Sequence, residues 1–400
     1  MSNLKQITMR HTKITISLLM FLMFFSLLAQ ENKSLSKSKV AATKKGDLIV
    51  CDISKLSETV RIPLSEFTEE LQIIKLDDAD EALIKETFVT ISENYFLVKG
   101  NREIPYKLFE RKTGKFLNNI GAFGQGPGEY QNVYNQQLDE VNNRIYLLPW
   151  NARNIIVYDL KGNLLDPIPL CNSVPKGNFK VDTKGGTLIV SALPFAGIKA
   201  VVWQQTMKGE LLKSVAPGHL SVKPDFSNEM SAYKEGSNYS INIFTFQPRR
   251  DSIYHYDLNQ NKLIPVFTLD FKSQEMPIHF YTEISGYFMG GFAEEKKLNE
   301  NTSTTQNHRF YAVEKKSLKG SFFVLENDFL GGIEVEWPIN ALYGEYYVRN
   351  VDPGVLKDEL EKILKENNKM APEIKAKVTK LKDSITDNDN NYILYARIKK

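Results

Sequence analysis

Apolar and polar positions recur along this chain at a nearly constant interval. Each repeat begins with an apolar strand, a polar turn and a second strand, and continues with a charged turn ending in glycine and a third strand. Three segments follow this plan: residues 95–117, 145–165 and 187–212. Their turn glycines, Gly114, Gly162 and Gly209, are 48 and 47 residues apart. An interval of about 48 residues with about four strands per unit predicts an all-β fold, a β-propeller of four-stranded antiparallel blades.

The repeat continues toward the C-terminus. Asp257 follows the equivalent Asp159 by 98 residues, which is close to two intervals, and residues 309–324 form a looser copy. From about Leu83 onward the interval fits six blades, with seven left open. Because a single blade cannot bury both faces, neighbouring blades must stack around an axis. A β-sandwich is the alternative, but the glycine register argues against it. The last strand, residues 392–398, is expected to close the ring with an N-terminal strand, for which Asp47–Ile53 is the candidate.

Residues 352–385 interrupt the strand pattern. Apolar residues recur there at spacings of three and four, which predicts two helices. They are Val355, Leu360, Ile363 and Leu364, then Ile374, Val378, Leu381 and Ile385. Pro353 and Pro372 suit the first position of each helix. We expect a helical insertion before the last strand that packs on the side of the propeller. A helical hairpin that binds a partner is the alternative.

The segment Gly121–Tyr130, called the glycine loop below, has four glycines and one proline between two predicted strands. If the innermost strand of each blade comes first, the turns between second and third strands share a face with the blade-to-blade crossings. We therefore expect one face to present the candidate binding residues: Asn101, Arg102, Gln125, Gly126, Gly128, Glu129, Tyr130, Trp150, Asn151, Arg153 and Phe195. An exposed tryptophan beside an arginine suits a sugar or a peptide. Trp150 packed between blades is the alternative interpretation.

The N-terminus has the three parts of a secretory signal. Lys5, Arg10 and Lys13 precede an apolar stretch, residues 14–28, and Ala29 is a small residue at a plausible cleavage point. Fifteen apolar residues fall short of the ~20 that a spanning helix needs, so export with cleavage is expected rather than a membrane anchor. No cysteine lies near the cut, which argues against lipid attachment. We expect a signal peptide at 1–29, a flexible tail at 30–46 and a propeller domain at 47–400.

Composition and charge say little about the function of the protein. Hydrophobic residues at 42% and charged residues at 25% are ordinary for a globular protein, and 18 Tyr with 23 Phe favour strands. The net charge of +3 falls to 0 without residues 1–29, which carry three cations and no acid. The charge therefore does not indicate a nucleic-acid partner. Cys51 and Cys171 could form one disulfide in an oxidising compartment, but two buried thiols are favoured.

No motif for catalysis is recognisable in the sequence. The histidines lack metal-ligand spacing, and there is no nucleophile elbow or dinucleotide fingerprint. The glycine loop lacks the GK[ST] ending of a phosphate-binding loop, and a strand rather than a helix follows it. Glu86, Asn132, Asn135 and Glu283 lie on or near predicted inner strands. They would either line a wet channel, which is favoured, or hold a divalent ion. No cofactor is expected.

The loop Phe123–Tyr130, the residues 64–84, the turn Asp159–Gly162 and the C-terminal residues 387–400 resemble six-bladed β-propeller proteins of Bacteroidetes, a group similar to NHL-repeat propellers. The resemblance implies an exported propeller and no catalytic residues. The first hypothesis is an exported, non-enzymatic protein that binds a glycan, peptide or envelope protein through the face with the glycine loop. The second is a metal-dependent propeller enzyme of the lactonase, lyase or cyclotransferase type. The third is a scaffold for an envelope complex, with the helical insertion as its dock.

Overall fold

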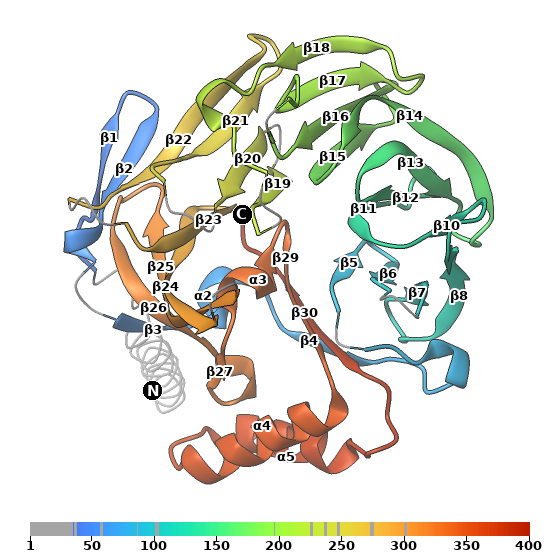
Figure 1. Ribbon diagram of the computed structural model, residues 1–400. Helices are drawn as coiled ribbons and strands as arrows, with labels where there is room; N and C mark the ends of the chain where they lie inside the picture. Colours follow the sequence, from blue (N-terminus) through green and yellow to red (C-terminus); the bar gives the residue numbers. More distant parts are fainter. Residues whose placement is uncertain are drawn as a thin grey trace, which may run out of the picture.

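Six antiparallel sheets stand around a common axis and form a six-bladed β-propeller (Figure 1). The computed structural model describes residues 35, 38–56, 59–85, 87–100, 104–195, 197–224, 227–235, 238–245, 249–272, 276–299 and 302–400. The predicted propeller is confirmed, and the blade number left open between six and seven is six. The predicted signal peptide, most of the tail, and Glu86, Asn101 and Arg102 lie outside the described residues.

In blades 1 to 3 the strands follow one another from the axis outward in chain order (Figure 1). Blade 1 contains β5 (Val89–Ile91), β6 (Tyr95–Val98), β7 (Tyr106–Glu110) and β8 (Phe116–Ile120). Blade 2 contains β11 (Val133–Asp139), β12 (Arg144–Pro149), β13 (Ala152–Tyr158) and β14 (Leu164–Val174). Blade 3 contains β15 (Gly177–Asp182), β16 (Thr187–Ala192), β17 (Val202–Thr206) and β18 (Leu211–Val215).

The later blades have the same plan with additions. Blade 4 contains β19 (Glu229–Glu235), β20 (Asn238–Phe244), β21 (Ile253–Asp257) and β22 (Lys262–Asp270). Blade 5 contains β23 (Ile278–Ile284), β24 (Tyr287–Asn299), β25 (Thr302–Glu314), β26 (Gly320–Asn327) and β27 (Ile333–Val335). Blade 6 contains β28 (Leu342–Tyr343), β29 (Tyr346–Val351), β30 (Tyr392–Arg397) and β4 (Gln72–Lys75).

The hydrophobic core lies between neighbouring blades. Leu97 and Leu108 of blade 1, for example, pack with Ile145 and Leu147 of blade 2, and all four side chains are fully buried. Alternation along each strand sends side chains to both faces of a blade, so each blade contributes to two cores. Stacking around the ring is therefore what buries the apolar residues of the repeat.

The repeated glycines occupy equivalent places, as predicted. Gly114, Gly162 and Gly209 lie between the third and fourth strands of blades 1, 2 and 3, with φ of 74°, 83° and 86°. A Cβ atom on Gly162 would lie 2.6 Å from the carbonyl oxygen of Asn119, on the outer strand of the preceding blade. On Gly114 it would lie 2.0 Å from the carbonyl oxygen of Lys75. The recurrence of glycine at this turn is thus explained by its positive φ and by its close approach to the preceding blade.

The N-terminal segment forms the outermost strand of three successive blades. β1 (Ala42–Lys45) and β2 (Leu48–Asp52) extend blade 4, where β2 is parallel to β22. β3 (Thr59–Pro63) is parallel to β26 of blade 5. β4 then pairs antiparallel with β30, from Gln72 opposite Tyr395 to Lys75 opposite Tyr392, and closes the ring. Closure by an N-terminal strand is confirmed, but the predicted strand Asp47–Ile53 was the wrong one, because β2 belongs to blade 4.

Three buried asparagines join the end of the chain to its beginning. The Asn390 amide donates to the carbonyl oxygens of Asp77 at 2.8 Å and Ala82 at 3.0 Å. Its oxygen accepts from the Ile84 amide at 3.3 Å. Asn391 donates to the Asn350 side chain at 2.9 Å, and Asn350 donates to the Lys85 and Thr87 carbonyl oxygens. Side-chain amides thus satisfy the irregular backbone between β4 and blade 1, where no strand ladder can do so.

The predicted helices are present and begin at the predicted prolines. α4 (Pro353–Glu366) and α5 (Pro372–Ser384) connect β29 to β30 and lie outside the ring (Figure 1). The Asp352 carboxylate caps α4 by accepting from the Gly354 amide at 2.8 Å. Two shorter helices are α2 (Leu64–Phe67) and α3 (Pro338–Ala341).

The buried stripe of α4 differs by one position from the prediction. Leu356 and Leu360 are fully buried, whereas Val355 is 48% exposed. α4 packs beside β27, and α5 packs beside the 3-10 turn Asp328–Leu330. After α4, Asn367 donates to the Gly331 carbonyl oxygen at 2.8 Å. The insertion therefore lies against blade 5, on the side of the propeller as expected.

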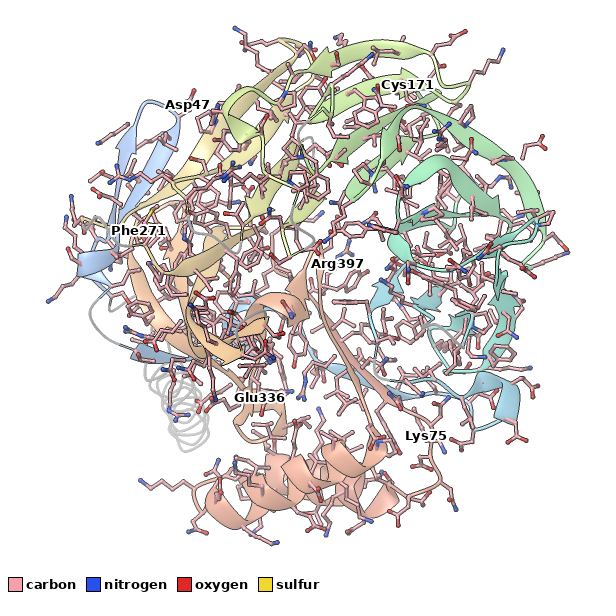
Figure 2. All side chains as sticks on the ribbon, viewed as in Figure 1. Asp47, Lys75, Cys171, Phe271, Glu336 and Arg397 are labelled. Atoms are coloured by element: carbon pink, nitrogen blue, oxygen red, sulfur yellow. The ribbon has the colours of Figure 1, made fainter. Side chains whose placement is uncertain are left out.

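The two cysteines are unpaired. Cys51 is buried in β2, and burial raises the pKa of its thiol to about 12. Cys171 lies in β14 of blade 2 and is half-buried (Figure 2). The favoured interpretation of two buried thiols is confirmed for Cys51 but not for Cys171, which is only half-buried. Among the described residues, none of the helices has the length and apolar character required to cross a membrane.

Candidate functional site

The glycine loop lies on the outer side of the ring between blades 1 and 2 (Figure 1). Its two short strands, β9 (Ala122–Phe123) and β10 (Glu129–Tyr130), pair in parallel, and Figure 1 shows β10 beside β8 and β14. A Cβ atom on Gly128 would meet the Leu164 side chain of β14 at 2.9 Å. The crossing therefore packs on the outer strand of the next blade.

The hydroxyl groups of two tyrosines bind backbone groups in and beside the glycine loop. The Tyr130 side chain is 4% exposed, and its hydroxyl accepts from the Tyr106 amide at 2.8 Å while donating to the Ile120 carbonyl oxygen. The Tyr158 hydroxyl donates to the Gly128 carbonyl oxygen. Burial raises the pKa of both tyrosines, that of Tyr158 to about 12. Both hydroxyls therefore stay protonated at neutral pH and are available as donors. The burial of Tyr130 argues against its expected contact with a ligand.

In the exposed part of the loop, polar groups form hydrogen bonds with one another. The Glu129 carboxylate accepts from the Gly126 amide at 2.8 Å, and the Glu129 amide donates to the Gly126 carbonyl oxygen at 3.0 Å. A Cβ atom on Gly124 would lie 1.9 Å from the same carboxylate. Gln125 and Glu129 are exposed. The glycine density thus has a structural cause, a turn closed over a glutamate, which the sequence alone does not distinguish from a ligand-binding loop.

Residues 150–153, called the Trp150 turn below, are the two residues between β12 and β13 of blade 2 and the first two residues of β13. They present the exposed aromatic ring predicted there. The Trp150 side chain is 43% exposed, and its backbone amide donates to the Asn132 carbonyl oxygen at 2.6 Å. Asn151 has a φ of 54°, and its amide donates to the Pro175 carbonyl oxygen at 2.9 Å. Arg153 is exposed. The alternative in which Trp150 packs between blades does not fit this exposure.

Phe195 lies in the corresponding turn of blade 3 but is less available. Its side chain is half-buried against a core cluster that contains Leu193, Leu220 and Val222. Its backbone forms an isolated parallel bridge with Val222. Of the predicted binding residues, the structure therefore brings together Trp150, Asn151 and Arg153, whereas Phe195 belongs to another blade.

Polar side chains of the inner strands join neighbouring blades. Gln136 donates to the Thr90 hydroxyl at 3.1 Å, which links blades 2 and 1. Asn135 donates to the Asn178 oxygen at 2.8 Å, and Asn178 donates to the Met230 carbonyl oxygen at 3.0 Å. Asn135 was a candidate for lining a wet channel or holding an ion, and it is half-buried in a chain of amides across three blades. Sequence reasoning missed this chain, because its members are dispersed over inner strands of different repeats.

Glu283 is the centre of a second inter-blade cluster. Its carboxylate, on β23 of blade 5, is 2% exposed and contacts the Ser240 hydroxyl at 2.5 Å, His255 Nε2 at 2.7 Å and Lys315 Nζ at 2.9 Å. Burial raises its pKa, and the ammonium of Lys315 opposes that rise. The four groups hold blade 4 to blade 5. Among the described residues, no three His, Cys, Asp or Glu side chains gather in a group able to hold a metal ion.

The family of the chain follows from its sequence. Residues 48–397 match DUF4934, a domain of unknown function. The chain belongs to the DUF4934 family. That match spans all six blades and the helical insertion. No curated protein matches the chain.

Solved structures share the fold of this DUF4934 chain at low identity. A candidate exported protein from Bacteroides fragilis is 16% identical with a TM-score of 0.57, over 88% of this chain and 99% of its own. A DUF4221 member from Bacteroides vulgatus is 11% identical with a TM-score of 0.44, over 83% and 97%. The periplasmic gluconolactonase of Pseudomonas aeruginosa is 10% identical with a TM-score of 0.36, over 60% and 69%. At these identities only the shared propeller fold follows, and it rests on the first of them.

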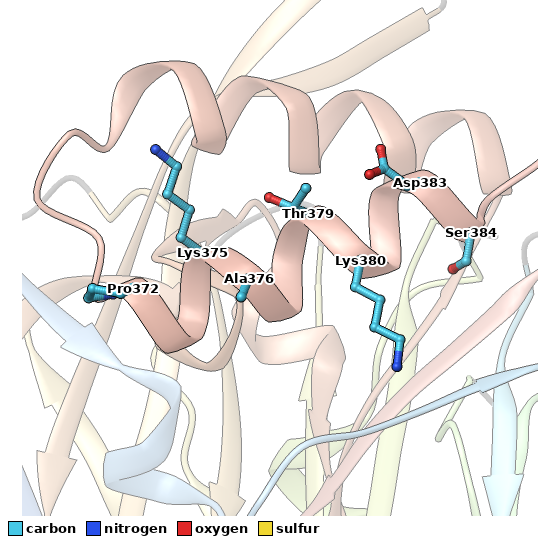
Figure 3. A pocket seen from close by; sticks show the side chains of 7 residues that line it. All are labelled: Pro372, Lys375, Ala376, Thr379, Lys380, Asp383 and Ser384. Carbon is cyan, nitrogen blue, oxygen red and sulfur yellow. The ribbon is translucent and has the colours of Figure 1, made fainter.

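The surface of the DUF4934 propeller has two hollows away from the Trp150 turn. One, of about 790 Å³, is a shallow depression along the outward side of α5, between Pro372 and Ser384 (Figure 3). The other, of about 340 Å³, lies on blade 5 and is called the blade-5 groove below. Aromatic and charged side chains of β25, β26 and the segment before α3 line it, among them His308, Phe310 and Trp337. The sequence repeat did not predict this groove.

Proposed function

We propose that this protein is an exported, non-enzymatic propeller that binds a glycan, a peptide or an envelope protein through the face that carries the Trp150 turn. Export is supported by the signal-like residues 1–29 and by the Bacteroides fragilis structure, whose protein is described as a candidate for export. The proposed binding surface centres on Trp150, Asn151 and Arg153 and extends to Gln125, Gly126, Gly128 and Glu129 of the glycine loop. Phe195, in the corresponding turn of blade 3, belongs to the same proposed face.

One observation carries this proposal: the indole of Trp150 is exposed on a turn whose backbone is fixed. The amides of Trp150 and Asn151 both donate to neighbouring crossings, to Asn132 and Pro175. A rigid aromatic ring loses little conformational freedom when it is covered, and this favours it as a binding anchor. Arg153, three residues after Trp150, adds a cationic donor for a sugar hydroxyl or a peptide carboxylate.

The metal-dependent enzyme is not favoured by any specific contact. Asn135 and Glu283, two of its proposed ligands, are bonded to Asn178 and to the Ser240, His255 and Lys315 groups. Each would have to leave a protein partner before it could bind a cation. The two residues support blade packing instead.

Replacing Trp150 by alanine is expected to weaken binding at least about tenfold, since a central aromatic anchor contributes ~2 kcal/mol or more. An array of oligosaccharides and peptides identifies the best probe, and calorimetric titration of that probe measures the change. Val141→Ala is the control, because Val141 is 91% exposed on the opposite face of the same blade. Equal binding by Trp150→Ala and the wild type, or no binding to any probe, would contradict the proposal.

A further inference from the structure

The hairpin of β24 and β25 extends beyond the sheet of blade 5. β23 pairs with β24 only from Tyr287 to Ala293, and β26 pairs with β25 only from Phe310 to Val313. Beyond those points, residues 294–299 and 302–306 pair with each other. Among the described residues, this part of the hairpin has no further strand at either edge. It is a two-stranded ribbon with two open edges.

The two edges of the ribbon differ in their protection. β24 carries four consecutive charged residues, Glu294 to Lys297. The β1 edge of blade 4 similarly carries Lys44 and Lys45. Charges of this kind keep open strand edges from pairing with other chains. Residues 302–306 of β25 are Thr, Ser, Thr, Thr and Gln, with no charge and three β-branched side chains that favour strand pairing. The β25 edge is therefore suited to accept another strand.

Apolar surface lies at both ends of the ribbon. At its base, the blade-5 groove contains Trp337, which is 44% exposed, with the His308 ring 4.4 Å from the Trp337 ring. The Phe310 ring is 5.9 Å from that of Trp337. Near its tip, Leu298 is 58% exposed. Seven residues of strand, from Thr302 to His308, cover about 20 Å between tip and base.

We infer that this edge binds a second copy of the chain, with β25 of each copy antiparallel to β25 of the other around a two-fold axis. In an antiparallel pair, the tip of one ribbon lies beside the base of the other. Leu298 of each copy then approaches the blade-5 groove of its partner, and the contact occurs twice. With Thr305 of one copy opposite Thr305 of the other, the neighbouring residues that face each other are uncharged, so no like charges meet. The exposed leucine and the aromatic groove are thus complementary surfaces on one molecule.

The test is the mass of the purified chain in solution, measured by sedimentation velocity over a range of concentrations. The wild type is expected to form a dimer. Thr304→Lys places a cation in each of two facing strands and is expected to raise the dissociation constant about tenfold or more. Thr304→Glu has the same effect alone, and mixing the Lys and Glu variants restores the dimer. Leu298→Ser weakens it without adding a charge.

The control is Thr43→Lys, the same substitution on the exposed β1 edge of blade 4, which is expected to leave the dimer unchanged. All variants lie outside the inter-blade cores, so their thermal unfolding should match that of the wild type. A chain that remains a monomer at every concentration overturns the inference, as does a dimer that Thr304→Lys leaves intact. Probe binding through Trp150 is measured separately, so either proposal can fail without the other.

Discussion

Replacing Asn390 by alanine is expected to lower the free energy of unfolding by about 3–5 kcal/mol, because a buried polar group left without its partner costs ~1–3 kcal/mol. The side chain is 2% exposed and bonds the Asp77 and Ala82 carbonyl oxygens and the Ile84 amide. All three partners belong to the segment between the closing strand β4 and blade 1. Chemical denaturation followed by tryptophan fluorescence and circular dichroism measures the loss.

Asn388→Ala is the matched control, since Asn388 is exposed two residues earlier in the same segment. It should change stability by less than about 0.5 kcal/mol, as surface substitutions usually do. If the two variants were equally stable, the asparagine contacts would not hold the end of the chain to its beginning.

Replacing Tyr130 by phenylalanine is expected to destabilise the protein by about 2–3 kcal/mol, although it removes only one oxygen atom. The hydroxyl bridges the ladder pair Tyr106–Ile120 at the end of blade 1, and without it a buried amide and a buried carbonyl lose a partner. The ring itself packs edge-to-face on Tyr106 at 5.7 Å and would stay in place. Thermal unfolding measures the effect.

Tyr311→Phe provides the opposite case in the same protein. Tyr311 is fully buried, and among the described residues its hydroxyl has no hydrogen-bond partner. Removing that oxygen relieves an unpaired buried group, so the variant should be as stable as the wild type or slightly more stable. A larger loss for Tyr311→Phe than for Tyr130→Phe would show that the Tyr130 contacts contribute little.

The fold was predictable because the repeat is local in the sequence. Gly114, Gly162 and Gly209 mark the same turn in successive blades, and positive φ with close approach to the preceding blade allows little else there. The helices of the insertion were predictable for the same reason, since Pro353 and Pro372 mark where they begin.

The closing strand was assigned to the wrong segment because pairing across the whole chain leaves no local signal. β2, β3 and β4 are four or five residues long, and each pairs with a strand more than 200 residues away. Asp47–Ile53 has the stronger strand pattern, yet it forms the fifth strand of blade 4. Which outer strand a short apolar segment covers depends on the path of the chain around the ring.

The candidate site was predictable only in part. The exposure of Trp150 follows from its place in a tight turn between β12 and β13, and sequence reasoning reached it through blade topology. The glycine loop looked like a binding loop because glycine permits both ligand approach and tight packing. Here packing accounts for it, since Tyr130, Tyr158 and Leu164 occupy the space that side chains would need.

The inter-blade polar contacts could not be anticipated from the repeat. Asn135, Asn178 and Glu283 each bond a residue of a neighbouring blade. Such contacts depend on the stacking geometry of two blades, which periodicity alone does not specify.

Hydrogen exchange of the closing strand tests the six-bladed ring most directly. Mass spectrometry of peptides that contain β4 (Gln72–Lys75) and β30 (Tyr392–Arg397) reports how long their backbone amides stay protected in the native protein. If β4 completes blade 6, both peptides exchange slowly and at similar rates, and both lose protection together in Asn390→Ala. Rapid exchange of β4, beside a protected β30, would contradict closure of the ring by the N-terminal segment.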